Sequence, residues 1–195
     1  AWHAANQSLI TRLDAGQVTM ATVRERRWPD TLSALGLDDP ALATALDARL
    51  VETFIGGVRL FEDVGTLPED LRERFHVGII TNGADDDALD SQRTKAARTG
   101  LLARVDSFLA SDAAGARKPG ARIFHLALER AGIAPDEALY VGDNIINDIV
   151  GAKRAGMMSV LIWRAPEPRP TLEGDERPAQ VIETLRELPA FLATL

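Results

Sequence analysis

Apolar positions in the first fifty residues follow helical spacing. Leucine, isoleucine and valine recur at three- and four-residue steps from Trp2 to Leu50, and no alternating run typical of a strand interrupts them. Gly16, Gly36 and the Asp38-Asp39-Pro40 cluster divide this stretch. The pattern therefore predicts about three helices.

Local signals set the expected ends of these helices. Thr19 should cap the second helix and Pro40 should open the third, because proline suits the first helical turn. Pro29 should kink its helix or end it. The glycine pair in Phe54-Ile55-Gly56-Gly57-Val58 offers the backbone freedom of a linker. We therefore expect a helical domain over residues 1–55 and a second domain over 56–195.

After Gly57 the pattern alternates between strands and helices, which predicts an α/β fold with a parallel sheet. The proline-rich, charged segment 166–178 is expected to be an exposed loop. The expected strands cover residues 75–80, 105–111, 139–141, 159–162 and 180–182, and the expected helices include 68–74, 121–131 and 185–195.

Polar residues follow the expected strand ends. Thr81-Asn82-Gly83 offers a hydroxyl, an amide and backbone N–H groups that suit a phosphoryl oxygen, although Asn-Gly is also a common turn pair. Lys118 stands just before a helix start at Pro119, where a lysine either offsets carboxylate and phosphate charge or lies free at the surface. Since ligands bind at the carboxyl edge of such sheets, these groups predict one site.

Two acids follow the strand that ends near Val141. Gly142-Asp143 closes this strand, and Asp148 lies on the turn into the next helical pattern. Carboxylate oxygens at this edge suit Mg²⁺. Acids at a helix start are equally common as caps. From this stretch alone, both interpretations stay open.

Other charged residues have simpler interpretations. The run Arg24-Glu25-Arg26-Arg27 either faces a substrate phosphate or forms a solvated helix face, and the solvated face is the commoner outcome. Asp85, Asp86 and Asp87 are expected to begin a helix that reaches Thr99 and to complement its dipole. His3 is expected at the surface.

Composition narrows the function classes. The formal net charge of −7 argues against a general nucleic-acid-binding protein, because such binding depends on lysine and arginine contacts with phosphates. No cysteine is present, which excludes disulfides and fits a reducing compartment. No apolar run reaches the roughly 18 residues of a membrane helix, and the start has no signal pattern. We expect a cytoplasmic monomer or homodimer that binds neither nucleic acid nor membranes.

Taken in order, Thr81-Asn82-Gly83, Lys118-Pro119 and the stretch from Gly142 to Asp148 make the chain similar to the haloacid dehalogenase (HAD) superfamily of hydrolases. The resemblance is strongest to its Mg²⁺-dependent phosphatases with a helical (C1-type) cap. It implies a three-layer, Rossmann-like α/β core with a parallel sheet, and a small all-helical cap domain.

The resemblance also implies roles for the matching residues. Thr81 would bind the phosphoryl group, assisted by Asn82 and Gly83. Lys118 would neutralise the nucleophile and the transferred phosphoryl group. Asp148 would orient Lys118 or a metal-bound water, and Asp143 would bind Mg²⁺.

One family motif has no counterpart in residues 1–195. The Asp-x-Asp pair at the end of an N-terminal strand supplies the family's nucleophile, and Asp85-Asp86-Asp87 follows the wrong strand to replace it. The resemblance puts this strand at the sheet centre, between those ending in Thr81 and Gly142. Without this strand, backbone groups would be unpaired and the core would have a gap. Few small domains could bear that cost, because their free energy of unfolding is only roughly 5–15 kcal/mol. We therefore expect a longer chain, and residues 1–195 alone to be inactive and to bind Mg²⁺ weakly.

The leading hypothesis is a Mg²⁺-dependent phosphatase of a small phosphorylated metabolite, such as a nucleoside monophosphate, phosphoglycolate or a sugar phosphate, acting through an aspartyl-phosphate. The alternative is a catalytically inactive relative that binds a phosphorylated ligand or a partner. A haloacid dehalogenase is less favoured, because true dehalogenases lack the Gly-Asp turn that Asp143 provides here. Candidates for setting specificity in the cap are Arg24, Arg27 and Trp28.

Overall fold

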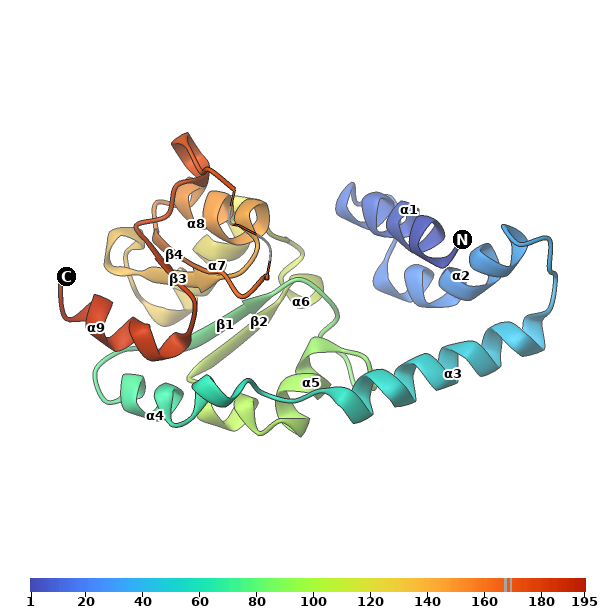
Figure 1. Ribbon diagram of the computed structural model, residues 1–195, viewed down its shortest axis with the longest axis horizontal. Coiled ribbons are helices and arrows are strands. Elements are labelled where there is room, and N and C mark those ends of the chain that lie inside the picture. The colour runs from blue at the N-terminus through green and yellow to red at the C-terminus, as the bar shows by residue number, and fades with distance from the viewer. Residues whose placement is uncertain (167, 169) are drawn as a thin grey trace. The chain divides into compact units, whose positions relative to one another are not determined.

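The computed structural model describes residues 1–166, 168 and 170–195, without the side chain of Asp14. The chain forms two compact units. The helical unit comprises Ala1–Val58 and Asp86–Lys95, and the core unit comprises Arg59–Asp85 and Ala96–Leu195. Figure 1 shows the first segment of the helical unit in blue to cyan and its second segment, which reaches into α5, in green, and all labelled strands belong to the core unit.

The helical unit begins with the expected helices α1 (Trp2–Asp14), α2 (Met20–Ser33) and α3 (Pro40–Gly57). Its small core forms between α1 and α2 around Leu9, Leu13 and Val23. The predicted caps are confirmed. Thr19 accepts a hydrogen bond from the Thr22 N–H at 3.2 Å, and Pro40 is the first residue of α3.

Two helix ends differ from expectation. The helix α2 does not end at Pro29, because Thr31 and Leu32 beyond it are buried and hold the last turn in place. The Gly56-Gly57 pair is helical rather than an irregular linker, since α3 continues to Gly57 with Ile55 buried in its last turns. Tertiary burial has outweighed the low helix propensity of proline and glycine. The division at residue 55 stays a prediction.

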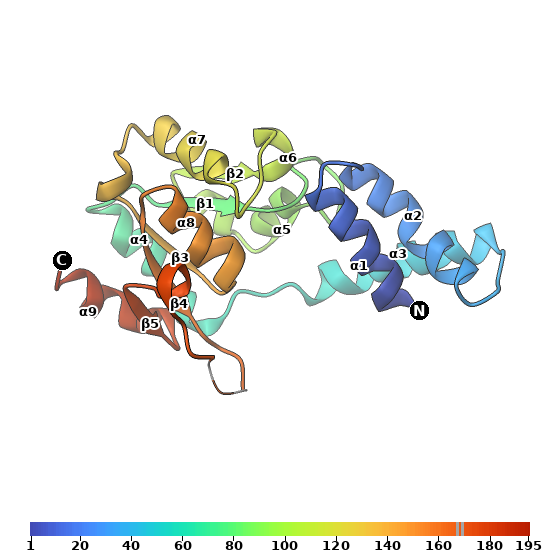
Figure 2. The ribbon, with the colours of Figure 1, turned by 90° about the horizontal axis from the view of Figure 1, so that it is seen from above.

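The core unit contains two parallel sheets, which confirms the α/β prediction (Figure 2). In the first, β1 (Gly78–Thr81) pairs with β2 (Ser107–Ala110). In the second, the order is β3 (Leu139–Gly142), β4 (Met158–Ile162) and β5 (Gln180–Ile182). Across the residues that the structure describes, no strand pairing joins β1 to β3.

Apolar side chains cover both faces of the strands. One cluster joins β2 to α7 (Ala121–Ala131) and α8 (Gly151–Arg154), with Tyr140 of β3 packed against it. The other joins β4 and β5 to α9 (Leu188–Leu192) and α4 (Leu67–Arg72). Strands therefore lie between two helical layers, as Figure 1 shows for α7 and α8 against α4 and α9.

Shorter elements complete the core unit and correct two expectations, the start of one helix and the form of the closing helix. The helix expected from Asp85 begins only at Gln92, as α5 (Gln92–Arg98). The closing helix is split into a 3-10 turn and α9. The loop 166–178 contains a 3-10 turn, and its residues Glu167 and Arg169 lie outside the described residues. The remaining elements are α6 (Ser111–Ala114), a π-helical turn (Ile145–Val150) and 3-10 turns at Glu62–Val64, Leu101–Arg104, Pro135–Glu137, Gly174–Glu176 and Leu185–Glu187.

Within the described ranges, none of the helices combines the length and the apolar character needed to cross a lipid bilayer.

Candidate active site

Lys118 is the centre of a hydrogen-bond network at the ends of β1 and β3. Its ammonium nitrogen lies 2.6 Å from Asp148 Oδ1, 2.9 Å from the Tyr140 hydroxyl and 3.2 Å from the Ile80 carbonyl oxygen. The side chains of Lys118 and Asp148 are only 11% and 5% exposed. A lysine ammonium has three N–H donors, so each donor has an acceptor within the chain.

The backbone of Lys118 is fastened to the end of β1. The Asn82 side chain donates to the Lys118 carbonyl at 3.0 Å, and the Lys118 N–H donates to Asn82 Oδ1 at 2.9 Å. These two hydrogen bonds hold the loop before α7 against the end of β1. The structure therefore brings Asn82, Lys118 and Asp148 together, while their chemical roles stay predictions.

Gly142 allows Asp148 to approach the strand. A Cβ at position 142 would lie 2.4 Å from Asp148 Cβ and 2.5 Å from its Oδ2, a separation that real side chains do not reach. Asp148 Oδ2 accepts the Asn144 N–H at 3.0 Å. The helix cap is instead Asn144, which accepts from the Asn147 N–H at 2.8 Å. Reading Asp148 as the helix cap is therefore wrong, and its carboxylate faces Lys118.

Asp143 is exposed at the end of β3. Nowhere in the described chain does its carboxylate have a hydrogen bond or an ion pair, and no group of three or more His, Asp or Glu side chains there is arranged to hold a metal. Mg²⁺ commonly takes only one or two protein carboxylates and completes its shell with water and substrate phosphate. Asp143 fits one such ligand position, and further protein ligands would have to come from other residues.

The two groups expected to donate hydrogen bonds to a phosphoryl oxygen, the Gly83 N–H and the Thr81 hydroxyl, already have partners within the chain. The Gly83 N–H donates to the hydroxyl of the buried Ser111 at 2.9 Å. The Thr81 hydroxyl makes a long 3.5 Å contact with the Asn82 carbonyl. Thr81 is therefore the more available donor at this edge, and binding through Gly83 would require its bond to Ser111 to open.

Sequence reasoning missed Tyr140 and Ser111. Tyr140 is the one tyrosine of the chain, and its hydroxyl lies 3.2 Å from Asp148 Oδ1 and 3.1 Å from the Ile80 carbonyl. Burial, together with the negative charge of Asp148, raises the pKa of Tyr140 above its ordinary value, so it stays a neutral phenol. A tyrosine within an apolar strand needs a partner for its hydroxyl, which was the available signal.

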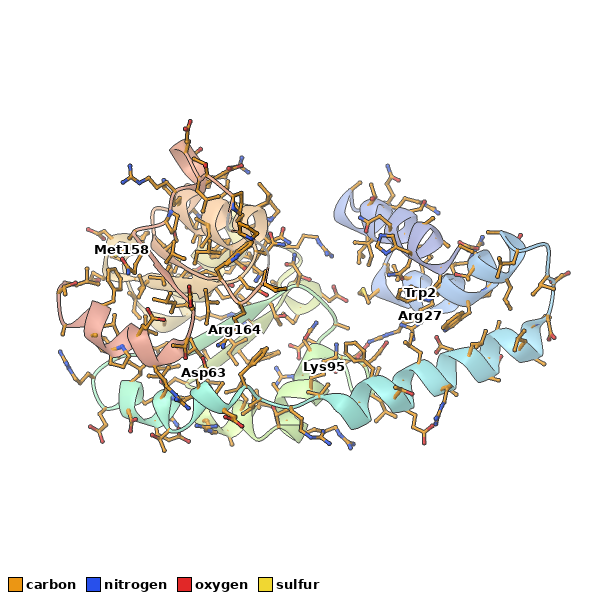
Figure 3. All side chains as sticks on the ribbon, viewed as in Figure 1. Trp2, Arg27, Asp63, Lys95, Met158 and Arg164 are labelled. Carbon is orange, nitrogen blue, oxygen red and sulfur yellow. The ribbon has the colours of Figure 1, made fainter. Side chains whose placement is uncertain are left out.

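Two arginines of α2, Arg24 and Arg27, belong to an ion-pair network within the helical unit, and Figure 3 labels Arg27. Arg27, only 10% exposed, binds Asp47 at 2.6 Å and Asp90 at 3.2 Å. Arg24 binds Asp86 at 2.7 Å and Asp90 at 2.8 Å. The solvated-face interpretation is therefore wrong for Arg24 and Arg27.

The same network explains the acidic run. Asp86 does not begin a helix, and the guanidinium of Arg24 lowers the pKa of its carboxyl. Of the α2 arginines, Arg26 does fit the solvated interpretation, since its side chain is 60% exposed and its ion pair is with Asp30, one turn away on the same helix.

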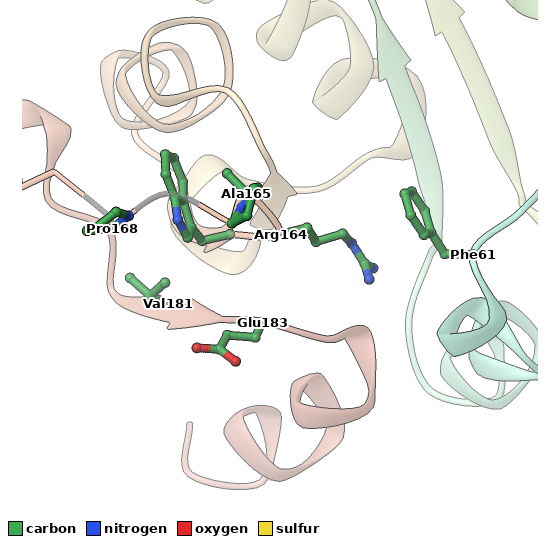
Figure 4. Close-up of a pocket in the computed structure, with 8 residues that line it drawn as sticks. Phe61, Arg164, Ala165, Pro168, Val181 and Glu183 are labelled. Atoms are coloured by element: carbon green, nitrogen blue, oxygen red, sulfur yellow. The ribbon is translucent and has the colours of Figure 1, made fainter.

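An open groove of about 770 Å³ lies at the ends of β4 and β5 (Figure 4). The Arg164 guanidinium lies 4.4 Å from the centre of the Phe61 ring and binds Asp63 at 2.7 Å. Thr81, Lys118, Asp143 and Asp148 do not line this groove. Its lining consists of Phe61, Trp163, Arg164, Ala165, Pro166, Pro168, Val181 and Glu183.

Asp63 forms a buried junction beside the groove. Burial alone would raise its pKa, but hydrogen bonds from the Leu185 N–H, Arg164 and the Thr184 hydroxyl lower the pKa to about 2. These bonds measure 2.8, 2.7 and 2.8 Å. Figure 3 shows Asp63 and Arg164 facing each other. This junction serves the fold, because it ties the Glu62–Val64 turn to the ends of β4 and β5.

The core unit thus combines parallel strands with a lysine–aspartate pair at the strand ends. Residues 5–156 match the family of haloacid dehalogenase-like hydrolases, and the chain belongs to this family.

Two relatives are named as phosphatases. The glyceraldehyde 3-phosphate phosphatase of Methanopyrus kandleri is 34% identical over 84% of this chain and 72% of its own length. The phosphoserine phosphatase of Thermus thermophilus is 37% identical over 94% of this chain and 76% of its own length.

Solved structures agree on the fold. The putative HAD-hydrolase YfnB of Bacillus subtilis, described with bound magnesium, superposes with a TM-score of 0.79 at 22% identity, covering 98% of this chain and 80% of its own. A 2-haloacid dehalogenase of Pseudomonas syringae pv. tomato has a TM-score of 0.71 at 28% identity, covering 99% and 80%. The α/β fold with parallel strands is thus that of the HAD-like hydrolases.

Proposed function

We propose that this chain carries most of a Mg²⁺-dependent phosphatase that hydrolyses a small phosphorylated metabolite. The observation that carries the proposal is the 2.6 Å pair of Lys118 and Asp148 at the ends of β1 and β3, with Asp143 exposed on the same turn. A fixed ammonium beside a carboxylate ligand for a divalent cation suits a reaction in which negative charge accumulates on phosphoryl oxygens.

Each proposed site residue contributes to binding or charge. Lys118 would donate to the phosphoryl oxygens and to the nucleophile, and Asp148 would hold its ammonium in place. Thr81, with Asn82 and Gly83, would bind a phosphoryl oxygen from the end of β1. Asp143 would hold Mg²⁺, which when bound supplies positive charge next to the transferred group.

The nucleophile would be an aspartate on a strand outside residues 1–195. Its carboxylate oxygen would attack phosphorus as the bond to the leaving oxygen breaks, and water would then hydrolyse the aspartyl-phosphate and release phosphate. In the proposed active enzyme this strand lies between β1 and β3, and residues 1–195 alone are inactive.

Sheet geometry supports such a strand. β1 and β3 leave their facing edges unpaired among the described residues. An additional strand would pair with these edges, and it would replace the 3.1 Å contact between the Tyr140 hydroxyl of β3 and the Ile80 carbonyl of β1. We further propose that the helical unit, predicted as residues 1–55, acts as the cap.

The named relatives support a class of substrate. Glyceraldehyde 3-phosphate and phosphoserine are both small phosphomonoesters, so a related metabolite, a phosphoglycolate, a sugar phosphate or a nucleoside monophosphate is the proposed substrate. The test is phosphate release by the full-length protein, with and without Mg²⁺, from a panel of these compounds. If the folded protein released phosphate from none of them, the proposal would be wrong.

A second candidate is a dehalogenase, favoured by the 28% identity with the Pseudomonas syringae enzyme. It would displace halide from a haloacid and would not need the Asp143 carboxylate. Halide release in the presence of a chelator, without phosphatase activity, would support this candidate. A protein that binds phosphomonoesters but releases neither phosphate nor halide would instead be an inactive relative.

A further inference from the structure

The contact between Gly83 and Ser111 continues the pairing of β1 with β2 beyond the strand ends. Thr81 lies opposite Ala110 in the last register pair of this sheet, and Gly83 and Ser111 follow them along the chain. The Gly83 N–H donates to the Ser111 hydroxyl oxygen at 2.9 Å, and the Gly83 carbonyl oxygen accepts from the Asp112 N–H at 3.3 Å. These contacts lie on the side of β1 that β2 already occupies, so the further strand proposed at the opposite edge leaves them in place.

Ser111 is placed to accept a hydrogen bond. The residue is only 4% exposed, so its hydroxyl depends on partners within the chain. The hydroxyl proton has two acceptors, the Gly83 carbonyl oxygen and Asp112 Oδ1, and both lie at a long 3.4 Å. The 2.9 Å bond from the Gly83 N–H is therefore the main contact of this hydroxyl.

The turn formed by Thr81, Asn82 and Gly83 is held at two points by the chain between β2 and α7. The Asn82 side chain is bonded to both backbone groups of Lys118, and Gly83 is bonded to Ser111. The backbone φ of Gly83 is 141°, a conformation that residues other than glycine rarely adopt. Because glycine has access to many conformations, the bond to Ser111 selects the one that this turn adopts.

The bond to Ser111 also sets the direction of the peptide between Asn82 and Gly83. The N–H and the C=O of a trans peptide point in opposite directions, so the Asn82 carbonyl oxygen points away from Ser111. This oxygen lies 3.5 Å from the Thr81 hydroxyl, too far for a strong hydrogen bond. The Thr81 hydroxyl can therefore turn its proton to a phosphoryl oxygen while the Gly83 N–H stays with Ser111.

We propose that Ser111 is a positioning residue for phosphoryl binding: its buried hydroxyl holds the Gly83 N–H and so keeps the turn in the shape from which Thr81 donates to the phosphoryl group. The inference rests on the proposed phosphatase function, and it assigns no contact between Ser111 and the substrate. Without this bond the glycine peptide gains conformational freedom, and a phosphoryl group has to order the turn as it binds. Gly83 contributes through the shape of the turn.

Ser111→Ala in the full-length protein removes the acceptor of the Gly83 N–H. We expect the dissociation constant of inorganic phosphate, measured by calorimetric titration in the presence of Mg²⁺, to rise roughly tenfold, the effect of losing about one hydrogen bond. Ser159→Ala is the matched control, because Ser159 is also buried, at 2% exposed, and its hydroxyl has no hydrogen-bond partner in the described residues. The control should bind phosphate as the wild type does.

The dissociation constant separates positioning from a loss of stability. Unfolding of part of the sample would lower the number of binding sites and would leave the dissociation constant of the folded protein unchanged. An unchanged dissociation constant in Ser111→Ala would therefore overturn the proposal, and so would an equal rise in Ser159→Ala.

A double-mutant cycle shows whether Ser111 acts through the turn. Thr81→Val removes the hydroxyl that the turn presents and keeps the shape of the side chain. In this background Ser111→Ala should raise the dissociation constant of phosphate by less than about twofold. An equal fractional rise in both backgrounds would show that the two residues act independently, and would overturn the proposal.

A measurement on the wild-type protein needs no variant. The Gly83 amide proton should keep its NMR chemical shift when phosphate binds, because its acceptor does not change. A large downfield shift would mean that the N–H leaves Ser111 for a charged phosphate oxygen, and it would overturn the proposal even if Ser111→Ala failed to fold.

Failure of the proposed function has a different signature. A wild-type protein that binds phosphate but hydrolyses no phosphomonoester would refute the phosphatase alone, and the titrations and the amide shift would still decide the role of Ser111. A wild-type protein that binds no phosphate would refute both.

Discussion

At the scale of single residues, Gly142 leaves too little space for an added Cβ atom. Gly142→Ala would add a Cβ 2.4 Å from Asp148 Cβ, so Asp148 must move and its 2.6 Å contact with Lys118 must lengthen. We expect a loss of about 1–3 kcal/mol in the free energy of unfolding, typical of overpacking, together with a large loss of activity. Chemical denaturation and phosphate release measure the two effects.

Gly56→Ala is the matched control for this substitution. Gly56 lies inside α3, and an added Cβ would meet nothing within 4 Å. We expect unchanged activity and a gain of about 0.5–1 kcal/mol, because alanine favours helix over glycine. If Gly142→Ala behaved like Gly56→Ala, the close approach of Asp148 to the strand would not matter.

Sequence analysis predicted that residues at the strand ends would lie together, and the structure brings Lys118 and Asp148 into contact, while their roles stay predictions. Lys118 and Asp148 meet because parallel strands bring their carboxyl ends to one edge, which the alternating pattern already implied. Tyr140 was missed because its three polar neighbours come from β1, the loop before α7 and the turn after β3. Only the folded arrangement reveals such a convergence.

At the scale of elements, Arg27 joins α2 to α3 and to the segment after Gly83. It is nearly buried between Asp47 and Asp90. Arg27→Met would leave these carboxylates without their cation, and we expect a loss of about 2 kcal/mol or more in unfolding free energy. Arg26→Met, at a 60% exposed position on the same helix, should change stability by less than about 0.5 kcal/mol. Equal effects would contradict the buried network.

The arginine network also shows why charge runs are difficult to interpret from sequence. Arg24 and Asp86 are 62 positions apart in the chain, so no local pattern pairs them. For the same reason the acids at 85–87 suggested a helix start, although α5 begins only at Gln92. By contrast, α7 and β5 were predicted at their observed bounds, because their apolar spacing and flanking turn residues are local signals.

The Asp63 junction predicts a pH dependence of stability. The folded-state pKa of Asp63, about 2, is below the ordinary 3.8, so its stabilisation is complete above pH 3.8 and is lost as pH falls from 3.8 towards 2. The shift corresponds to about 2 kcal/mol for this 8% exposed side chain. Asp63→Asn should therefore lose stability at neutral pH and show a weaker decline on acidification, as measured by urea unfolding.

An exposed aspartate provides the comparison. Asp136→Asn on the Pro135–Glu137 turn should leave both the neutral stability and the acid decline as in the wild-type protein. If Asp63→Asn and the wild type lost stability in parallel below pH 3.8, Asp63 would not be the group responsible.

At the scale of the whole molecule, the family assignment and the parallel α/β core unit are consistent with the proposed phosphatase. The core unit already has two helical layers, parallel strands and the lysine–aspartate pair. Residues 1–195 contain no Asp-x-Asp pair after an N-terminal strand, and the source of the nucleophile stays a proposal. The substrate was not predictable, because it depends on cap contacts that periodicity does not determine.

The most direct test of the proposed function compares phosphate release by the full-length wild-type protein and by Asp143→Asn across a Mg²⁺ titration, with Asp136→Asn as the control. We expect Mg²⁺-dependent turnover in the wild type and the control, and a loss of about 100-fold or more in kcat for Asp143→Asn with an unchanged circular dichroism spectrum. Wild-type turnover that Asp143→Asn retains at every Mg²⁺ concentration would contradict the assignment of this strand edge as a metal-dependent phosphoryl-transfer site.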